Sequence, residues 1–171
     1  SPKTFYYYNI EINSKNIGVI GHSEGGMIAP MLAATDKNIA FIVLLAGTGV
    51  PGDVLFVDQN YEVGRLRGMT EDQLENAKIE TQKIYDLIKA DGSLTVAKKN
   101  LAAYFQANID KIPEAERPSQ EEVDTTIKQE VDAIATPWLR YFITYNPKEN
   151  LMKVKCPVLV LNGDRDIQVT A

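Results

Sequence analysis

Residues 21–25 read Gly-His-Ser-Glu-Gly, which places one serine between two glycines at the spacing Gly-x-Ser-x-Gly. This spacing is typical of a nucleophile elbow, a tight turn from a strand into a helix that presents the serine hydroxyl at its corner. A hydroxyl held in this way can attack a carbonyl carbon and form an acyl-enzyme. We expect Gly21 and Gly25 to supply the lack of bulk that the turn needs, and Gly26 to bring the helix close to the sheet. The alternative is that Ser23 only caps the following helix.

Acyl transfer also needs a base to take the serine proton and a carboxylate to orient that base. Asp164 and Asp166 both follow the apolar segment 158–162, and Asp164 could instead bind backbone amides of the turn. His22 is the only histidine. Because it neighbours Ser23 on a strained turn, we expect its ring to point away from the serine hydroxyl and to pack or hydrogen-bond behind the turn.

Short elements must position this serine. Residues 17–20 are continuously apolar and predict a buried parallel strand, and apolar residues after Gly26 recur at helical spacing. The N–H of Glu24 would lie at the start of this helix, where it can donate to an oxyanion. Pro30 is expected to kink the helix near its middle. The apolar run 40–46 then predicts a second parallel strand, reached by a right-handed crossover.

The next hundred residues show helical periodicity and no convincing strand. Their helix signals are two capping boxes (Thr70 with Gln73, Ser119 with Glu122), a stop at 91–92, a periodic span over 94–109, and two proline starts (Pro137 and Pro147). The apolar run 157–162 predicts a third buried strand. The aromatic-rich residues 1–13 read as the end of a helix packed on the sheet.

Composition narrows the function classes. The 171 residues are enough for one sizeable core, and a net charge of -5 with mixed signs argues against a nucleic-acid surface. No apolar run has the length of a membrane span, and the N-terminus does not read as a signal peptide. Cys156 is the only cysteine, so we expect a buried thiol without a disulfide. No metal and no organic cofactor is implied.

This order of elements resembles the α/β-hydrolase superfamily. The resemblance implies an α/β fold class, with a partial α/β-hydrolase core, a short parallel sheet made of the superfamily's strands 5, 6 and 7, and a helical cap insertion. Residues 1–50 and 151–171 would form the core, and residues 51–150 would form the helical cap.

A narrower similarity rests on residues 22–26 (His-Ser-Glu-Gly-Gly), residues 138–142 (Trp-Leu-Arg-Tyr-Phe) and residues 146–147 (Asn-Pro). Together they look like a capped bacterial carboxylesterase branch with dienelactone-hydrolase-like and serine-aminopeptidase-like members. The turn 163–169, read as Gly-x-x-Asp-x-x-Val, is similar to the superfamily's acid-bearing loop and places Asp166 at the acid position.

The same resemblance implies substrate contacts from a cap helix that leans over the site. Trp138, Arg140 and Tyr141 lie on the stretch that would form this helix, and Arg140 would contact an acyl or carboxylate group. In the alternative, Trp138 packs within the cap and Arg140 is solvated.

In the superfamily the histidine base follows the acid, and a second oxyanion donor comes from the loop after strand 3. Neither is present in these 171 residues, so we expect a fragment that lacks the N-terminal strands and the histidine segment, and that is nearly inert alone. A parallel sheet cut free of its neighbours exposes edges and apolar faces, from which we hypothesise self-association.

The function that follows is a serine hydrolase of the carboxylesterase type, acting on small or medium esters through an acyl-enzyme. Two alternatives stay open: an acyl-peptide or aminopeptidase-type hydrolase, and a non-catalytic relative that uses the cap as a binding surface. The expected partner is a small-molecule ester, with no nucleic acid and no membrane. Localisation is left open, since cytoplasmic and exported bacterial enzymes both fit.

Overall fold

The computed structural model describes residues 12–90 and 93–169 and divides into two compact units. Unit 1 consists of Ser1–Pro51 and Asn146–Ala171, and unit 2 consists of Gly52–Tyr145. The helix end expected within residues 1–13 falls almost wholly outside the described residues, and so does the helix stop expected at 91–92.

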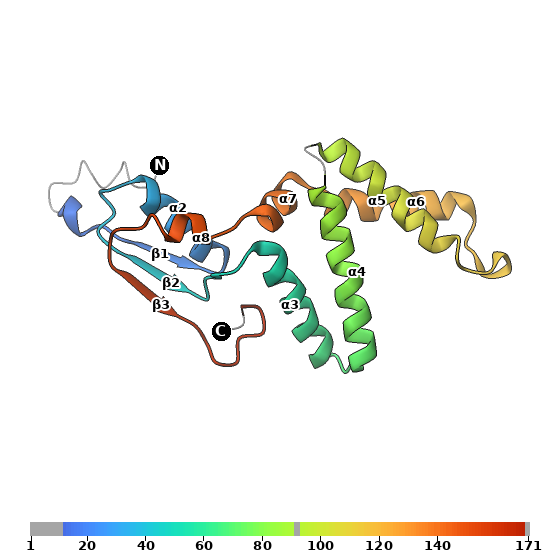
Figure 1. Ribbon diagram of the computed structural model, residues 1–171, viewed down its shortest axis with the longest axis horizontal. Helices are drawn as coiled ribbons and strands as arrows, with labels where there is room; N and C mark the ends of the chain where they lie inside the picture. The colour runs from blue at the N-terminus through green and yellow to red at the C-terminus, as the bar shows by residue number, and fades with distance from the viewer. Residues whose placement is uncertain (1–11, 91–92, 170–171) are drawn as a thin grey trace. The chain divides into compact units, whose positions relative to one another are not determined.

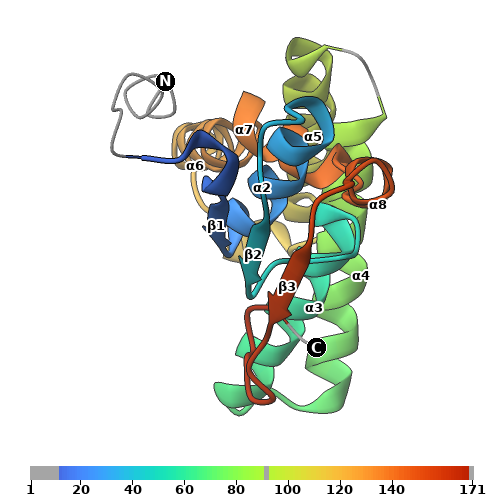
Figure 2. The ribbon, with the colours of Figure 1, turned by 90° about the vertical axis from the view of Figure 1, so that its left-hand side faces the viewer.

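Unit 1 is built on a parallel sheet of three strands in the order β1-β2-β3. The strands are β1 (Val19–His22), β2 (Ile42–Leu45) and β3 (Val158–Leu161), and they lie side by side in Figures 1 and 2. The prediction of three parallel strands within an α/β fold is confirmed. The expected burial of the third strand was wrong, because all four residues of β3 are exposed. A short 3-10 helix, η1 (Ser14–Asn16), precedes β1.

Helix α2 (Glu24–Thr35) packs on one face of β1 and β2, and the short helix α8 (Lys148–Leu151) packs beside α2. Side chains alternate between the two faces of a strand, so Ile42 and Leu44 share the α2 face, where each is less than 5% exposed. Ile20 and Leu159 are register partners of the same residue of β2 and lie on the other face, where they are 67% and 52% exposed.

Helix α2 runs through Pro30, which is buried, and continues to Thr35. The prediction that Pro30 lies within the helix is therefore confirmed. Cys156 is a partly buried free thiol that packs against the α2–sheet core.

Unit 2 is helical throughout its described residues. Its elements are α3 (Gly52–Leu66), α4 (Glu71–Lys89), α5 (Leu94–Ile109), η2 (Glu114–Glu116), α6 (Gln120–Ile134) and α7 (Pro137–Thr144). Both predicted capping boxes form, at Thr70 and at Ser119, and α5 spans the residues that its periodicity predicts. The sequence analysis did not predict where helix α3 begins.

The core of unit 2 joins α3 to α7 through side chains that are almost completely buried, among them Ile88, Leu101 and Ile143. A partly buried ion pair of 2.5 Å between Asp53 of α3 and Lys89 of α4 adds to this packing. Burial lowers the pKa of Lys89, but the hydrogen bond and charge of Asp53 outweigh burial and raise it overall. No described helix is long and apolar enough to cross a membrane.

Candidate functional site

Ser23 occupies the single position between the last residue of β1 and the first residue of α2. Its backbone has φ 54° and ψ −117°, a conformation that costs a non-glycine residue on the order of 1–3 kcal/mol. Strain of this kind is characteristic of a nucleophile elbow. The predicted turn between a parallel strand and a helix is therefore present.

Close contacts explain two of the three glycines around this turn. A Cβ on Gly21 would lie 1.9 Å from the carbonyl oxygen of Gly25, and a Cβ on Gly26 would lie 2.5 Å from the Cα of Gly47. No side chain fits at either position. The expectation for Gly25 was wrong, because a Cβ there would meet open space. Gly26 and Gly47 thus hold the start of α2 against the end of β2.

The hydroxyl of Ser23 does not cap the helix that follows it. Ser23 is the N-cap residue of α2 but makes no side-chain capping hydrogen bond. Four other described helices begin at Thr70, Ser93, Ser119 and Thr136, and each of these hydroxyls accepts a backbone N–H at 3.1–3.4 Å. The alternative reading of Ser23 as a helix cap is contradicted, and its exposed side chain is left for other chemistry.

Glu24 directly follows Ser23 and is the first residue of α2, so its backbone N–H points out of the start of the helix. The carbonyl of Ser23 accepts the N–H of Gly26 at 2.8 Å, which closes the first turn. The positive end of the helix dipole adds a favourable field for negative charge at this corner.

Asp166 lies in the loop that follows β3, and its Oδ1 accepts two backbone N–H groups, from Gln168 at 2.8 Å and from Val169 at 3.0 Å. Its own N–H donates to the carbonyl of Gly163 at 3.2 Å. The sequence reading had offered amide binding as the role of Asp164. Among the described residues, however, Asp164 makes no hydrogen bond, and Asp166 binds the loop amides with one oxygen only.

Strand register brings Ser23 and Asp166 to the same edge of the sheet. The last residues of the strands, His22, Leu45 and Leu161, are aligned in register. Because all three strands are parallel, the residues that follow them meet at the carboxyl edge, where such sheets bind ligands. The prediction that both residues share this edge is confirmed.

The backbone at this carboxyl edge of the sheet includes residues with unusual dihedral angles. Ser23 N–H donates to the carbonyl of Leu45 at 2.9 Å, and Ala46 N–H donates to the carbonyl of Leu161 at 2.9 Å, so the ladder continues one residue past the strands. Ala46 has φ 49°, and with Ser23 it is one of two non-glycine residues of positive φ in the described chain. Nothing in the sequence signalled Ala46.

His22 lies on the face of the sheet opposite α2, because it alternates with the buried Gly21. Its side chain is exposed, and within the described chain it has no hydrogen-bond or ion-pair partner. The structure therefore gives no packing or hydrogen bonding behind the turn, which the sequence reading had expected of it.

Trp138, Arg140 and Tyr141 lie on α7, in unit 2. The guanidinium of Arg140 donates one hydrogen bond to the carbonyl of Ile88 at 2.7 Å, so this partly buried side chain takes part in the packing of unit 2. Trp138 packs against Phe142 with ring centroids 5.4 Å apart and remains 52% exposed, and Tyr141 is 59% exposed. Arg140 thus has a structural contact, whereas the rings of Trp138 and Tyr141 are exposed.

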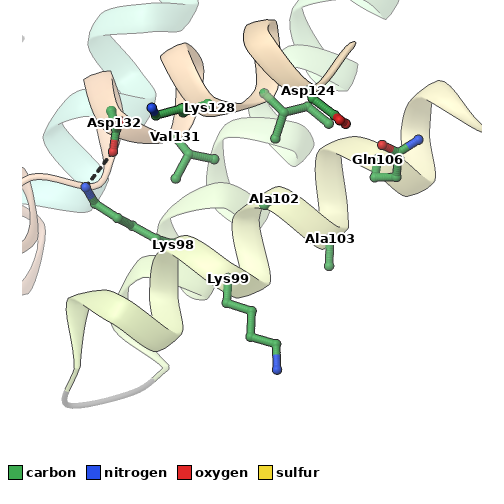
Figure 3. Close-up of a pocket in the computed structure, with 10 residues that line it drawn as sticks. Lys98, Lys99, Ala102, Ala103, Gln106, Asp124, Lys128, Val131 and Asp132 are labelled. Atoms are coloured by element: carbon green, nitrogen blue, oxygen red, sulfur yellow. Dashed lines mark hydrogen bonds and ion pairs between the residues drawn. The ribbon is translucent and has the colours of Figure 1, made fainter. Parts of the chain in front are cut away.

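A groove with a volume of about 580 Å³ lies between α5 and α6 (Figure 3). Ala102, Ile127 and Val131 are among its apolar lining residues. An ion pair of 2.6 Å joins Lys98 on α5 to Asp132 on α6 (Figure 3). None of the ten residues that line it is a serine, cysteine or histidine. Nor do three metal-binding side chains gather anywhere in residues 12–90 and 93–169.

The exposed, strained Ser23 lies between a parallel strand and a helix, and the loop with Asp166 follows a strand at the same sheet edge, an arrangement consistent with a partial α/β-hydrolase domain. The model of the family described as BAAT / Acyl-CoA thioester hydrolase C terminal matches residues 4–107, which are 104 of the 171 residues. The chain belongs to this family, which lies within the α/β-hydrolase superfamily and indicates hydrolase activity in general. No curated protein and no solved structure matches the chain.

Proposed function

We propose that this chain carries the nucleophile and the acid of a serine hydrolase of the carboxylesterase type. The Oγ of Ser23 attacks the carbonyl carbon of an acyl ester while a base takes the hydroxyl proton. The tetrahedral oxyanion then collapses, and the alcohol leaves with that proton. Water, deprotonated by the same base, attacks the acyl-enzyme and releases the carboxylic acid and the free Ser23 hydroxyl.

The observation that carries this proposal is the state of the Ser23 side chain. It is held at the corner in a strained backbone conformation, and its hydroxyl is exposed although the same helix position in other parts of the chain is used for capping. A serine kept for structural reasons would gain about 1 kcal/mol from a cap bond and would avoid the strain.

Each remaining part of the mechanism has a proposed residue. The N–H of Glu24 donates to the oxyanion from the start of α2. The Oδ2 of Asp166, whose Oδ1 is already bound to loop amides, accepts the N–H of an imidazole and fixes its tautomer. His22, the only histidine of the sequence, lies on the face of the sheet opposite α2, so it is not the proposed base.

The substrate class is proposed to be small or medium acyl esters. The family description favours acyl thioesters as a second candidate, since thioester and ester cleavage use the same nucleophile and oxyanion site.

The test is covalent labelling by a fluorophosphonate probe, with added imidazole as the missing base. We expect slow labelling that rises with imidazole concentration and maps to Ser23, and loss of the label in Ser23→Ala. Ser119→Ala is the matched control, because it removes a helix-cap serine of unit 2. Labelling that ignores imidazole, or that survives in Ser23→Ala, would refute the proposal and favour a non-catalytic relative.

Substrate class is then read from the imidazole-dependent acylation of Ser23 by three acyl donors that share one short acyl chain: a p-nitrophenyl ester, a thioester and an anilide. Ester turnover above anilide turnover supports the carboxylesterase type. Faster reaction of the thioester would move the assignment to the second candidate, and faster reaction of the anilide would favour an aminopeptidase-type hydrolase.

A further inference from the structure

Asn162 is the residue directly after β3, and it extends the register that aligns Leu161 with Leu45 and His22. The ladder bond from Ala46 N–H to the Leu161 carbonyl fixes the backbone on which Asn162 stands. Its place is therefore at the carboxyl edge, at the point where the acid loop leaves the sheet.

The side chain of Asn162 reaches across this loop. Its Nδ2 donates to the carbonyl of Val169 at 2.8 Å, which ties the end of β3 to a residue seven positions later. The N–H of the same residue, Val169, donates to Oδ1 of Asp166 at 3.0 Å. Val169 is also buried, at 7% exposure. One residue of the loop is thus held by Asn162 at its carbonyl and by Asp166 at its amide.

We infer that Asn162 is a positioning residue for the acid: it fixes Val169, and Val169 in turn fixes the carboxylate of Asp166. This inference rests on the proposed function, in which Oδ2 of Asp166 orients the base. A carboxylate held at Oδ1 can rotate less, so Oδ2 meets the imidazole in one direction. The role requires an N–H donor of this reach, which neither an apolar side chain nor a shorter hydroxyl provides.

The test uses the imidazole dependence of fluorophosphonate labelling at Ser23. Two quantities come from it: the imidazole concentration for half-maximal rate, and the rate without imidazole. In Asn162→Leu we expect the half-maximal concentration to rise on the order of tenfold, because misorientation of a catalytic group by about 1 Å has effects of this size or larger. The rate without imidazole should stay unchanged, since Ser23 itself is not altered.

Asn38→Leu is the matched control. Asn38 also donates an Nδ2 hydrogen bond to a loop acceptor, Asp36, but in the turn before β2, at the other edge of the sheet. It should leave both quantities unchanged. Asn162→Gln keeps an amide donor and should recover part of the imidazole dependence. If Asn162→Leu does not fold, as judged by hydrogen exchange in β1 and β2, Asn162→Ser carries the test.

A double-mutant comparison separates positioning from a general effect on the fold. If Asn162 acts through Asp166, then Asn162→Leu should have no further effect in an Asp166→Asn background. Equal effects of Asn162→Leu in both backgrounds, or wild-type imidazole dependence in Asn162→Leu, would overturn the inference and leave the proposed function standing. Imidazole dependence that is absent from the wild type, or unaffected by Ser23→Ala, would instead refute the proposed function and the inference with it.

Discussion

Replacement of Ser23 by glycine should stabilise unit 1, although it removes the nucleophile. At φ 54° and ψ −117° a Cβ is in steric conflict with the backbone, and glycine removes that conflict. Replacement by alanine keeps the Cβ and therefore keeps the strain. The pair Ser23→Gly and Ser23→Ala thus separates the cost of the backbone conformation from the contribution of the hydroxyl.

The magnitudes follow from the local structure. Relief of the strain is worth about 1–3 kcal/mol, and the added freedom of glycine in the unfolded chain opposes it by about 0.4–1 kcal/mol. We therefore expect Ser23→Gly to raise the free energy of unfolding by about 1 kcal/mol. Ser23→Ala should change it by less than about 0.5 kcal/mol, because the hydroxyl makes no capping bond.

The assay must report on unit 1 alone. The only tryptophan, Trp138, belongs to unit 2, so its fluorescence serves as the control that unit 2 is unaffected. Native-state hydrogen exchange of peptides from β1 and α2 gives the opening free energy of unit 1. A loss of stability in Ser23→Gly, or a loss of 1 kcal/mol or more in Ser23→Ala, would show that the hydroxyl has a structural bond and that the elbow is not strained.

Three further outcomes are expected. Without imidazole the chain should label negligibly with a fluorophosphonate, because loss of the base costs serine hydrolases on the order of a million-fold in turnover; rapid labelling that His22→Ala abolishes would assign the base to His22. Leu101→Ala should lower the unfolding free energy of unit 2 by about 2–5 kcal/mol in a urea titration of Trp138 fluorescence, because Leu101 is completely buried, whereas Val96→Ala on the exposed side of α5 should change it by less than about 0.5 kcal/mol. The chain should self-associate in sedimentation experiments through its bare sheet, and Leu159→Glu should abolish this while Ile79→Glu on α4 does not; a clean monomer at high micromolar concentration would contradict it.

Local signals in the sequence predicted the parts of the fold that depend on local physics. Capping boxes at Thr70 and Ser119 succeed because both hydrogen bonds are made within four residues. The span 94–109 succeeds because Ser93 caps its start and its apolar residues keep one period. The tight turn at Ser23 has a local signal too, since a Cβ on Gly21 would meet the backbone of Gly25 and Gly26.

Long-range contacts explain what the sequence did not predict. Arg140 looked like a solvated or substrate-binding cation, but a carbonyl 52 residues away, that of Ile88, takes its guanidinium. For Gly26 the sequence predicted the close approach of the helix to the sheet but not the residue that it meets there, Gly47. Pro147 was expected in the first helical position and instead forms the N-cap of α8, a difference of one residue that proline geometry allows at either site.

At the carboxyl edge of the sheet, strained backbone conformations occur beside contacts that hold them in place. Ser23 and Ala46 adopt positive φ at the same register position of neighbouring strands, and ladder hydrogen bonds on both sides hold them in it. The close contact of Gly26 with Gly47 adds a steric brace between the helix and the loop that follow them. Next along the same edge, Asn162 holds the acid loop by its side chain. Backbone strain persists only where the surroundings over-determine it, and here three kinds of restraint converge on one edge. These restraints hold the positions of Ser23 and Asp166 at the edge on which the proposed function depends.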